Sequence, residues 1–329
     1  MNRDELLKRL GEGPLEQLDL RGVDLRGLSL PRATFLRCDL TGADFETSTL
    51  SGVSFDRCDL REARFTDSRL EGPSFESSDL RASVFSGASM ADAGLSKCDL
   101  RSARWTGVRV QGGWIADCLL EGIDLGRASF ESCLIRDCDL SHARFPGTSL
   151  HRVGATGIRF AKAEFSDCDL TDSDFSKADL TGAVFRNVAA ERTEFADAKL
   201  QEASLAGLRG ASTNFTRSAL VGANFLQARL PRACFEEADA TGAVFSEADL
   251  SFARCAGGKF VRAQFLRTRL SYVDFAHADL AGADFREADL ERADLHAVTE
   301  AGAVWTSAKL RHVRRTDPKL LQAESWTPD

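Results

Sequence analysis

Residues 276–295 read AHADLAGADFREADLERADL, and this stretch shows the pattern that decides the fold. A large apolar residue stands at every fifth position, and a small Ala stands two places before each one. The pattern extends in both directions without insertion or deletion: from Leu20 to Leu310, 47 of the 59 residues at multiples of five are Leu or Phe. A five-residue repeat therefore covers most of the 329 residues.

This period fits neither a straight helix nor a flat strand. Five residues advance an α-helix by about 500°, so the large residues would spiral around its axis. On a flat strand, an odd period sends successive large residues to opposite faces. If the chain turns a corner every five residues, the small and the large residue of each side both point inward. Columns taken every 20 residues support four sides, because Leu40 is followed by Leu60 and Phe45 by Phe65.

The repeated segments also resemble a known family. CDLTGADF at 38–45, ADLTGAVF at 178–185 and ADLERADL at 288–295 look like the repeats of the pentapeptide-repeat family. The resemblance implies the same quadrilateral β-helix that the period indicates. We therefore predict an all-β fold, a right-handed quadrilateral β-helix solenoid of about 15 four-sided coils, with short helical caps at its ends.

Three segments are expected along the chain. Residues 1–17 form an N-terminal cap, with a short helix from Asp4 to Leu10, and residues 18–313 form the β-helix. Residues 314–329 form a C-terminal tail, in which Asp317 followed by Pro318 is a helix-start signal. We expect this tail to cap the β-helix or to join two copies of the chain into a homodimer, through the apolar residues Leu320, Leu321 and Trp326.

Composition excludes several classes of partner. The net charge of −8 argues against direct binding of nucleic acid or of an anionic membrane. The N-terminal sequence lacks the apolar region of a signal peptide, and no apolar run reaches the roughly 20 residues that cross a bilayer. Nine cysteines without a CxxC pair indicate a reduced, cytoplasmic protein.

No group of residues predicts catalysis, a cofactor site or a metal site. The inward positions are almost free of acids and bases, and the five His residues show no metal-binding spacing. Seven of the nine Cys residues stand at the small inward position, where a thiol serves as a small core residue. A few positions break the five-residue pattern with a small or charged residue: Ala155, Ala190, Gly210, Ala240, Cys255 and Glu300.

Acidic residues support two interpretations. Asp precedes the large residue in one 20-residue column that includes Asp59, Asp79 and Asp99, and it either caps the turns or imitates the phosphates of DNA. Arginines two places later argue against a continuous negative stripe. A denser acidic set is a candidate surface, although its members spread around the coil: Glu164, Asp167, Asp169, Asp172, Asp174 and Asp179.

Outward apolar residues are the better candidates for an interaction surface. Some stand one coil apart, so that their side chains form contiguous patches, as Trp114 and Leu134 do. The alternative is ordinary surface decoration. The full candidate set is Trp114, Leu119, Leu134, Val221, Leu226, Phe252, Val261, Leu266 and Tyr272.

These features predict a non-catalytic protein that binds a protein partner or acts as a scaffold. Members of the family that resemble this chain include proteins that imitate DNA and protect DNA gyrase and related type II topoisomerases from quinolones or toxins. The resemblance implies this role as the alternative, supported here by the negative net charge.

Overall fold

The computed structural model describes residues 3–10 and 12–324, which fall into two compact units, one ending at Asp174 and the other beginning at Phe175. Each unit is a parallel β-solenoid in which the chain pairs with itself 20 residues further on. In the first unit Asp19 pairs with Asp39, and in the second Asp179 pairs with Lys199. Paired positions recur every five residues, so each coil has four sides.

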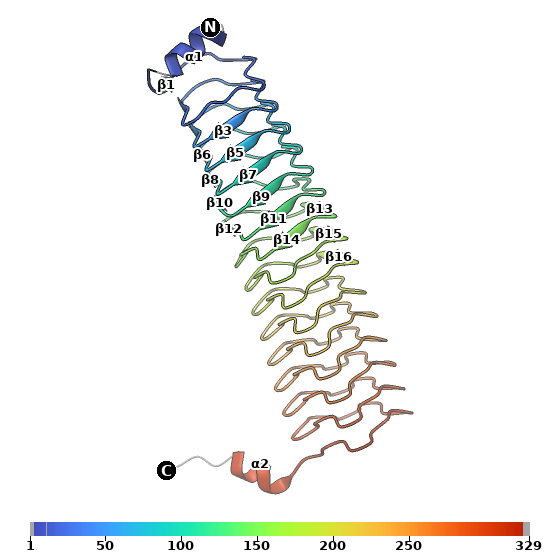
Figure 1. The fold of residues 1–329 in the computed structure, drawn as a ribbon. Coiled ribbons are helices and arrows are strands. Elements are labelled where there is room, and N and C mark those ends of the chain that lie inside the picture. Colours follow the sequence, from blue (N-terminus) through green and yellow to red (C-terminus); the bar gives the residue numbers. More distant parts are fainter. Residues whose placement is uncertain (1–2, 11, 325–329) are drawn as a thin grey trace, which may run out of the picture. The chain divides into compact units, whose positions relative to one another are not determined.

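The first unit contains helix α1 and most of the strands. Two parallel sheets stack one strand per coil, in the orders β1-β2-β4-β6-β8-β10-β12 and β14-β11-β9-β7-β5-β3, while β13 pairs with β15. Figure 1 shows strands β3 to β11 of the second sheet lying side by side on successive coils. The elements are α1 (Arg3–Leu10), β1 (Leu15–Glu16), β2 (Thr34–Leu36), β3 (Thr49–Ser51), β4 (Ser54–Asp56), β5 (Arg69–Glu71), β6 (Ser74–Glu76), β7 (Ser89–Ala91), β8 (Gly94–Ser96), β9 (Arg109–Gln111), β10 (Trp114–Ala116), β11 (Ser129–Glu131), β12 (Leu134–Arg136), β13 (Arg144–Pro146), β14 (Ser149–His151) and β15 (Glu164–Ser166).

The second unit contains strand β16 (Val184–Arg186) and helix α2 (Pro318–Glu324). Beyond β16 each side pairs through single residues, up to the pair of Asp294 with Arg314. The β-solenoid class is thus confirmed, but the expected 15 coils is an overcount, because the solenoid comprises about nine turns. The five-residue period also counted sides that pair through one residue and form no strand.

The five-residue period follows from how the interior is packed. In each three-residue strand the middle residue is buried, as Phe55 is in β4. Buried rings stack from coil to coil, with 4.8 Å between the ring centroids of Phe45 and Phe65. The rings of Phe55 and Phe65, from different sides, meet edge to face at 6.0 Å. Stacking at the strand spacing with edge contacts across the interior favours aromatic and large apolar residues at every fifth position.

The corners use the left-handed backbone region. The residue two places after the large one has a positive φ, for example 65° at Gly42 and 53° at Arg57. Glycine adopts this region without strain, and polar residues at the other corners accept a modest cost because the pairing on both sides fixes the turn.

Both ends of the described chain carry extra contacts. Leu6 of α1 is fully buried in the first unit. In the last coil, Glu300 occupies a position where other coils have a large apolar residue, and both of its carboxylate oxygens accept hydrogen bonds of 2.9 Å from Arg315. The Arg315 guanidinium lies 5.5 Å from the Trp305 ring centroid. This ion pair therefore covers an aromatic ring that has no further coil above it.

The break at Ala190 and Gly210 leaves no room for a larger side chain. A Cβ at Gly210 would lie 2.5 Å from the carbonyl oxygen of Ala190. Fully buried Thr213 donates its hydroxyl to the carbonyl oxygens of Ala190 and Gly210, at 2.9 and 2.8 Å. The two coils approach closely here, and Thr213 fills the space that large residues occupy elsewhere.

Candidate interaction surfaces

The interior offers no arrangement for catalysis among the side chains that the structure describes. None of the buried ones there is Asp, Glu, Lys or Arg. Buried hydroxyls are used for structure, as Ser48 shows by donating to the carbonyl oxygen of Phe45 at 2.6 Å. A general base, a nucleophile and an oxyanion site do not converge on a cavity, which acid–base or covalent catalysis requires.

The buried cysteines are packing residues with inactive thiols. Cys58 donates to the carbonyl oxygen of Phe35 at 3.3 Å, and Cys168 donates to that of Phe145 at 2.6 Å. Burial raises the pKa of each of these two thiols to about 12. Because the thiolate is the reactive form, they stay protonated and unreactive near neutral pH.

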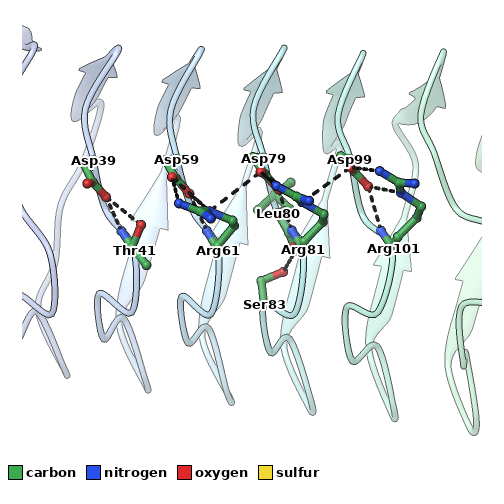
Figure 2. A network of polar contacts seen from close by, with 10 residues as sticks. All are labelled: Asp39, Thr41, Asp59, Arg61, Asp79, Leu80, Arg81, Ser83, Asp99 and Arg101. Carbon is green, nitrogen blue, oxygen red and sulfur yellow. Dashed lines mark hydrogen bonds and ion pairs between the residues drawn. The ribbon is translucent and has the colours of Figure 1, made fainter.

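The aspartate column of the first unit is neutralised by arginines. Asp59 accepts hydrogen bonds from Arg61 Nε at 2.8 Å and Nη2 at 2.6 Å, and its Oδ1 also accepts the Arg61 backbone N–H at 3.2 Å. Figure 2 shows the same arrangement at Asp79 and Asp99, with Arg61 also reaching Asp79 on the next coil, 3.8 Å from Nε to Oδ2. The aspartates therefore cap the turns and form a ladder of ion pairs with arginines.

This ladder shifts the protonation of its carboxylates. The hydrogen bonds from Arg61 hold the pKa of Asp59 below its ordinary value, and Arg101 does the same for Asp99. The column is also interrupted by exposed Leu119, which pairs with Asp99 and Asp139 along the backbone. It therefore presents alternating charge with an apolar break, unlike a line of phosphates.

The denser acidic set does not form one surface. Its members in the first unit pair with three different columns: Glu164 with Arg144, Asp169 with Ser149 and Asp174 with Gly154. They therefore lie on three sides of the solenoid, as the sequence indicates. Asp179 belongs to the second unit.

Trp114 and Leu134 form the clearest apolar patch. They pair in register on neighbouring strands β10 and β12 and are 41% and 47% exposed. Glycines flank the pair in the same column. A Cβ at Gly94 would lie 3.0 Å from the Trp114 ring, and one at Gly154 would lie 3.0 Å from a Leu134 methyl group. Both side chains thus lie along the face, over the glycines, and form one flat patch.

The second unit has a smaller aromatic pair. The rings of Phe252 and Tyr272 stack at 4.8 Å, and the Arg292 guanidinium lies 5.5 Å from the Tyr272 ring centroid. The remaining apolar candidates divide by exposure. Val221 and Leu226 are exposed, whereas Val261 and Leu266 are only half-buried, so the expectation that they are equally available is wrong for that second pair.

The C-terminal candidates are found on a short helix. Leu320 and Leu321 of α2 are exposed, and Trp326 lies outside the described residues. Asp317 caps the helix, since its Oδ1 accepts the Lys319 N–H at 2.9 Å.

A histidine cluster that the sequence analysis missed holds α2 to the preceding coils. His277 Nε2 and His296 Nε2 each lie 3.2 Å from the same oxygen of Glu324, and His296 is almost fully buried. The histidines are 19 residues apart, close to one coil, and this spacing is the signal that could have found them. We name the three residues the C-terminal clasp.

The clasp has the residue types of a metal site but the hydrogen bonding of a structural contact. Its three candidate ligand atoms lie within 4.8 Å of one another. However, His296 Nδ1 accepts the Asp317 N–H at 3.2 Å, which places the neutral ring's proton on Nε2, where it is donated to Glu324. A metal-binding histidine normally donates from its second nitrogen. The arrangement therefore favours a hydrogen-bonded clasp.

Within the described part of the chain, every helix is too short or too polar to span a membrane.

Stacked four-sided coils with an apolar interior define a parallel β-solenoid built from five-residue units. The family model for pentapeptide repeats matches residues 19–55, 38–75, 74–107, 116–152, 155–187, 178–209, 211–247, 248–286 and 268–299. The chain belongs to the pentapeptide-repeat family. No curated protein sequence matches it significantly.

Solved structures of similar proteins share its repeat but align loosely. Trypsin-treated QnrB1, a plasmid-mediated fluoroquinolone resistance protein, is 21% identical over 54% of this chain and 91% of its own, with a TM-score of 0.33. HetL from the cyanobacterium Nostoc is 20% identical over 95% and 96%, with a TM-score of 0.19. A pentapeptide repeat protein of the Arabidopsis thaliana thylakoid lumen is 27% identical over 38% and 72%, with a TM-score of 0.27. Scores this low carry no information about a partner.

Proposed function

We propose that this chain is a non-catalytic protein that binds another protein through the outer surface of its β-solenoid. The sealed interior supports this role, because chemistry is confined to side chains on the outside. Those side chains are held in regular columns by backbone pairing, so a partner would meet a preformed surface at little entropic cost.

The Trp114–Leu134 patch carries the proposal. An apolar pair with a tryptophan, exposed on a flat sheet face, is typical of the centre of a protein interface. The flanking glycines leave no side chain beside the pair that could cover it. Ser74, exposed in the same column two coils from Trp114, shows that polar residues fit this face, so folding does not require the apolar pair there.

The test compares Trp114→Asp with Ser74→Asp, which places the same charge in the same column. Each full-length protein is used to retain proteins from lysate of the source cells, after circular dichroism and thermal melting show that it is folded. We expect at least one protein to be retained by the wild type and by Ser74→Asp but lost from Trp114→Asp. Retention of the same set by all three would contradict a binding role for the patch.

The alternative is that the chain imitates DNA and binds DNA gyrase or another type II topoisomerase. The net charge of −8 and the family resemblance favour it. The Arg61 and Arg81 ion pairs weigh against it, because they remove the continuous negative potential that such imitation needs. A gyrase supercoiling assay with and without a quinolone tests it, and neither inhibition nor protection by the protein would exclude it.

A further inference from the structure

A polar groove of about 740 Å³ lies on the second unit, apart from the apolar candidates named above. Four arginines and two carboxylates line it, which makes it cationic on a protein whose net charge is −8. We name it the arginine groove. Its charged residues are Arg209, Arg229, Arg267, Arg269, Glu247 and Asp249.

Two of these arginines are already neutralised. Arg267 donates to Glu287 at 2.9 Å from Nε and 3.3 Å from Nη2. Arg269 Nη1 lies 3.3 Å from Asp249 Oδ2.

Both carboxylates of the groove are engaged as well. Glu247 accepts a hydrogen bond of 2.8 Å from Gln227. Asp249 accepts hydrogen bonds from the hydroxyl and backbone N–H of Ser251, at 2.6 and 3.1 Å. Neither carboxylate makes an ion pair with Arg209 or Arg229 among the contacts of the described residues.

Arg209 and Arg229 are exposed and lie on neighbouring coils. Their backbones pair directly, so their side chains start about 4.8 Å apart. Within the described residues neither guanidinium has a hydrogen-bond or ion-pair partner. Two adjacent cations without a counter-charge repel each other, and an anion placed between them would remove that repulsion.

Space is available beside this pair. Gly207 borders the groove at the position where the next coils carry Gln227, Glu247 and Arg267, and a Cβ placed on Gly207 would have no atom within 4 Å. The missing side chain leaves a path for a ligand to reach both guanidinium groups.

We propose that the arginine groove binds a phosphorylated small molecule, whose phosphoryl group is held between the guanidinium groups of Arg209 and Arg229. A phosphomonoester carries a charge of about −1.5 to −2 near neutral pH and three acceptor oxygens, so one group neutralises both arginines. A carboxylate carries half that charge. The volume exceeds that of phosphate alone, and Gln227, Glu247 and Asp249 offer polar contacts to hydroxyl groups of the ligand. This inference is independent of the proposed function.

The test is calorimetric titration of the full-length protein at constant ionic strength with inorganic phosphate, glucose 6-phosphate and glucose. We expect saturable binding of the phosphorylated sugar, weaker binding of phosphate and none of glucose. Removing the two arginines in Arg209→Ala/Arg229→Ala should weaken phosphate binding by about tenfold for each, as charged hydrogen bonds are lost.

Arg232→Ala/Arg262→Ala provides the matched control, because it removes the same charge from exposed arginines outside the groove. It should bind like the wild type. An equal loss in both double variants would show a general charge effect and overturn the proposal, as would the absence of phosphate binding to the wild type. Tighter binding of acetate than of phosphate would overturn the phosphoryl assignment.

Discussion

At the scale of single residues, the place of a residue within its five-residue side decides which substitutions it tolerates. Corner residues with positive φ point away from the interior, and a Cβ at the corner Gly122 would have no atom within 4 Å. Gly113 also has a positive φ, 77°, but it stands at a small inward position next to strand β10. A Cβ there would lie 2.2 Å from the carbonyl oxygen of Ala93, within the backbone of the preceding coil.

We therefore predict that Gly113→Ala destabilises the protein by about 3 kcal/mol or more, because left-handed strain and a backbone clash add together. Gly122→Ala has a similar φ of 68° and meets only the strain, so it should cost about 1 kcal/mol. Urea unfolding of both variants, followed by circular dichroism, measures the difference. Equal shifts of the unfolding midpoint would show that the coils at Gly113 can move apart freely.

At the scale of elements, the two helices depend on different contacts. Helix α1 contributes a fully buried residue, Leu6, whereas α2 buries no residue. Seven residues are too few for a helix to be stable alone in water. Helix α2 therefore depends on its Asp317 cap and on the contact of Glu324 with His277 and His296.

Glu324→Ala should consequently release α2. Loss of the two histidine contacts is worth about 1.4 kcal/mol, which corresponds to about tenfold faster amide hydrogen exchange in the helix. Lys319→Ala, on the same helix but without a side-chain contact among the described residues, is the control and should leave exchange unchanged. If Glu324→Ala exchanges like the wild type, the clasp does not hold the helix.

The same measurement distinguishes a hydrogen-bonded clasp from a metal site. Because His296 Nδ1 accepts the Asp317 N–H, binding of Zn²⁺ through Nε2 would turn that contact into a repulsion between two N–H groups. We predict that excess Zn²⁺ leaves the exchange of α2 unchanged. Slower exchange with zinc, abolished by His296→Ala, would show that the ring changes tautomer to bind metal.

At the scale of the whole molecule, the repeat predicts the interior and leaves the surface undetermined. Phe65 and Leu80 are fully buried, as their positions in the five-residue period require. Their surroundings are fixed by backbone pairing, which the period alone specifies. The pairing also explains why the acidic candidates spread over several sides and why Trp114 lies against Leu134.

Contacts that depend on side-chain direction could not be predicted in this way. The period marks Glu300 as an anomaly but does not show that Arg315 turns back to pair with it over Trp305. It likewise gives Val261 and Val221 equivalent positions, although their exposure differs because the side chains of neighbouring coils differ. The arginine groove depends on a missing side chain at Gly207, which the repeat treats as an ordinary corner.

The charge of the whole molecule is also organised by the repeat, since paired Asp and Arg recur on successive coils. Hydrogen bonds from arginines lower the folded-state pKa of Asp19 to about 2, and those of Asp59 and Asp284 fall below the ordinary value of 3.8. A lowered folded-state pKa means that the folded protein binds protons less readily than the unfolded chain. The resulting stabilisation is complete above about pH 4 and is lost as the pH falls toward the folded-state values.

We predict that the melting temperature falls between pH 4 and pH 2 and that Arg61→Gln/Arg81→Gln makes this fall shallower. The two arginines each hold an aspartate through hydrogen bonds of 2.6 Å, so without them the carboxylates titrate closer to their unfolded values. Each exposed pair contributes only about 0.2–1 kcal/mol, so the difference is read best from the slope of melting temperature against pH. Arg232→Gln, outside the ladder, should keep the wild-type slope. An unchanged slope in the double variant would mean that the ladder is screened by solvent and that the acid sensitivity arises from other carboxylates.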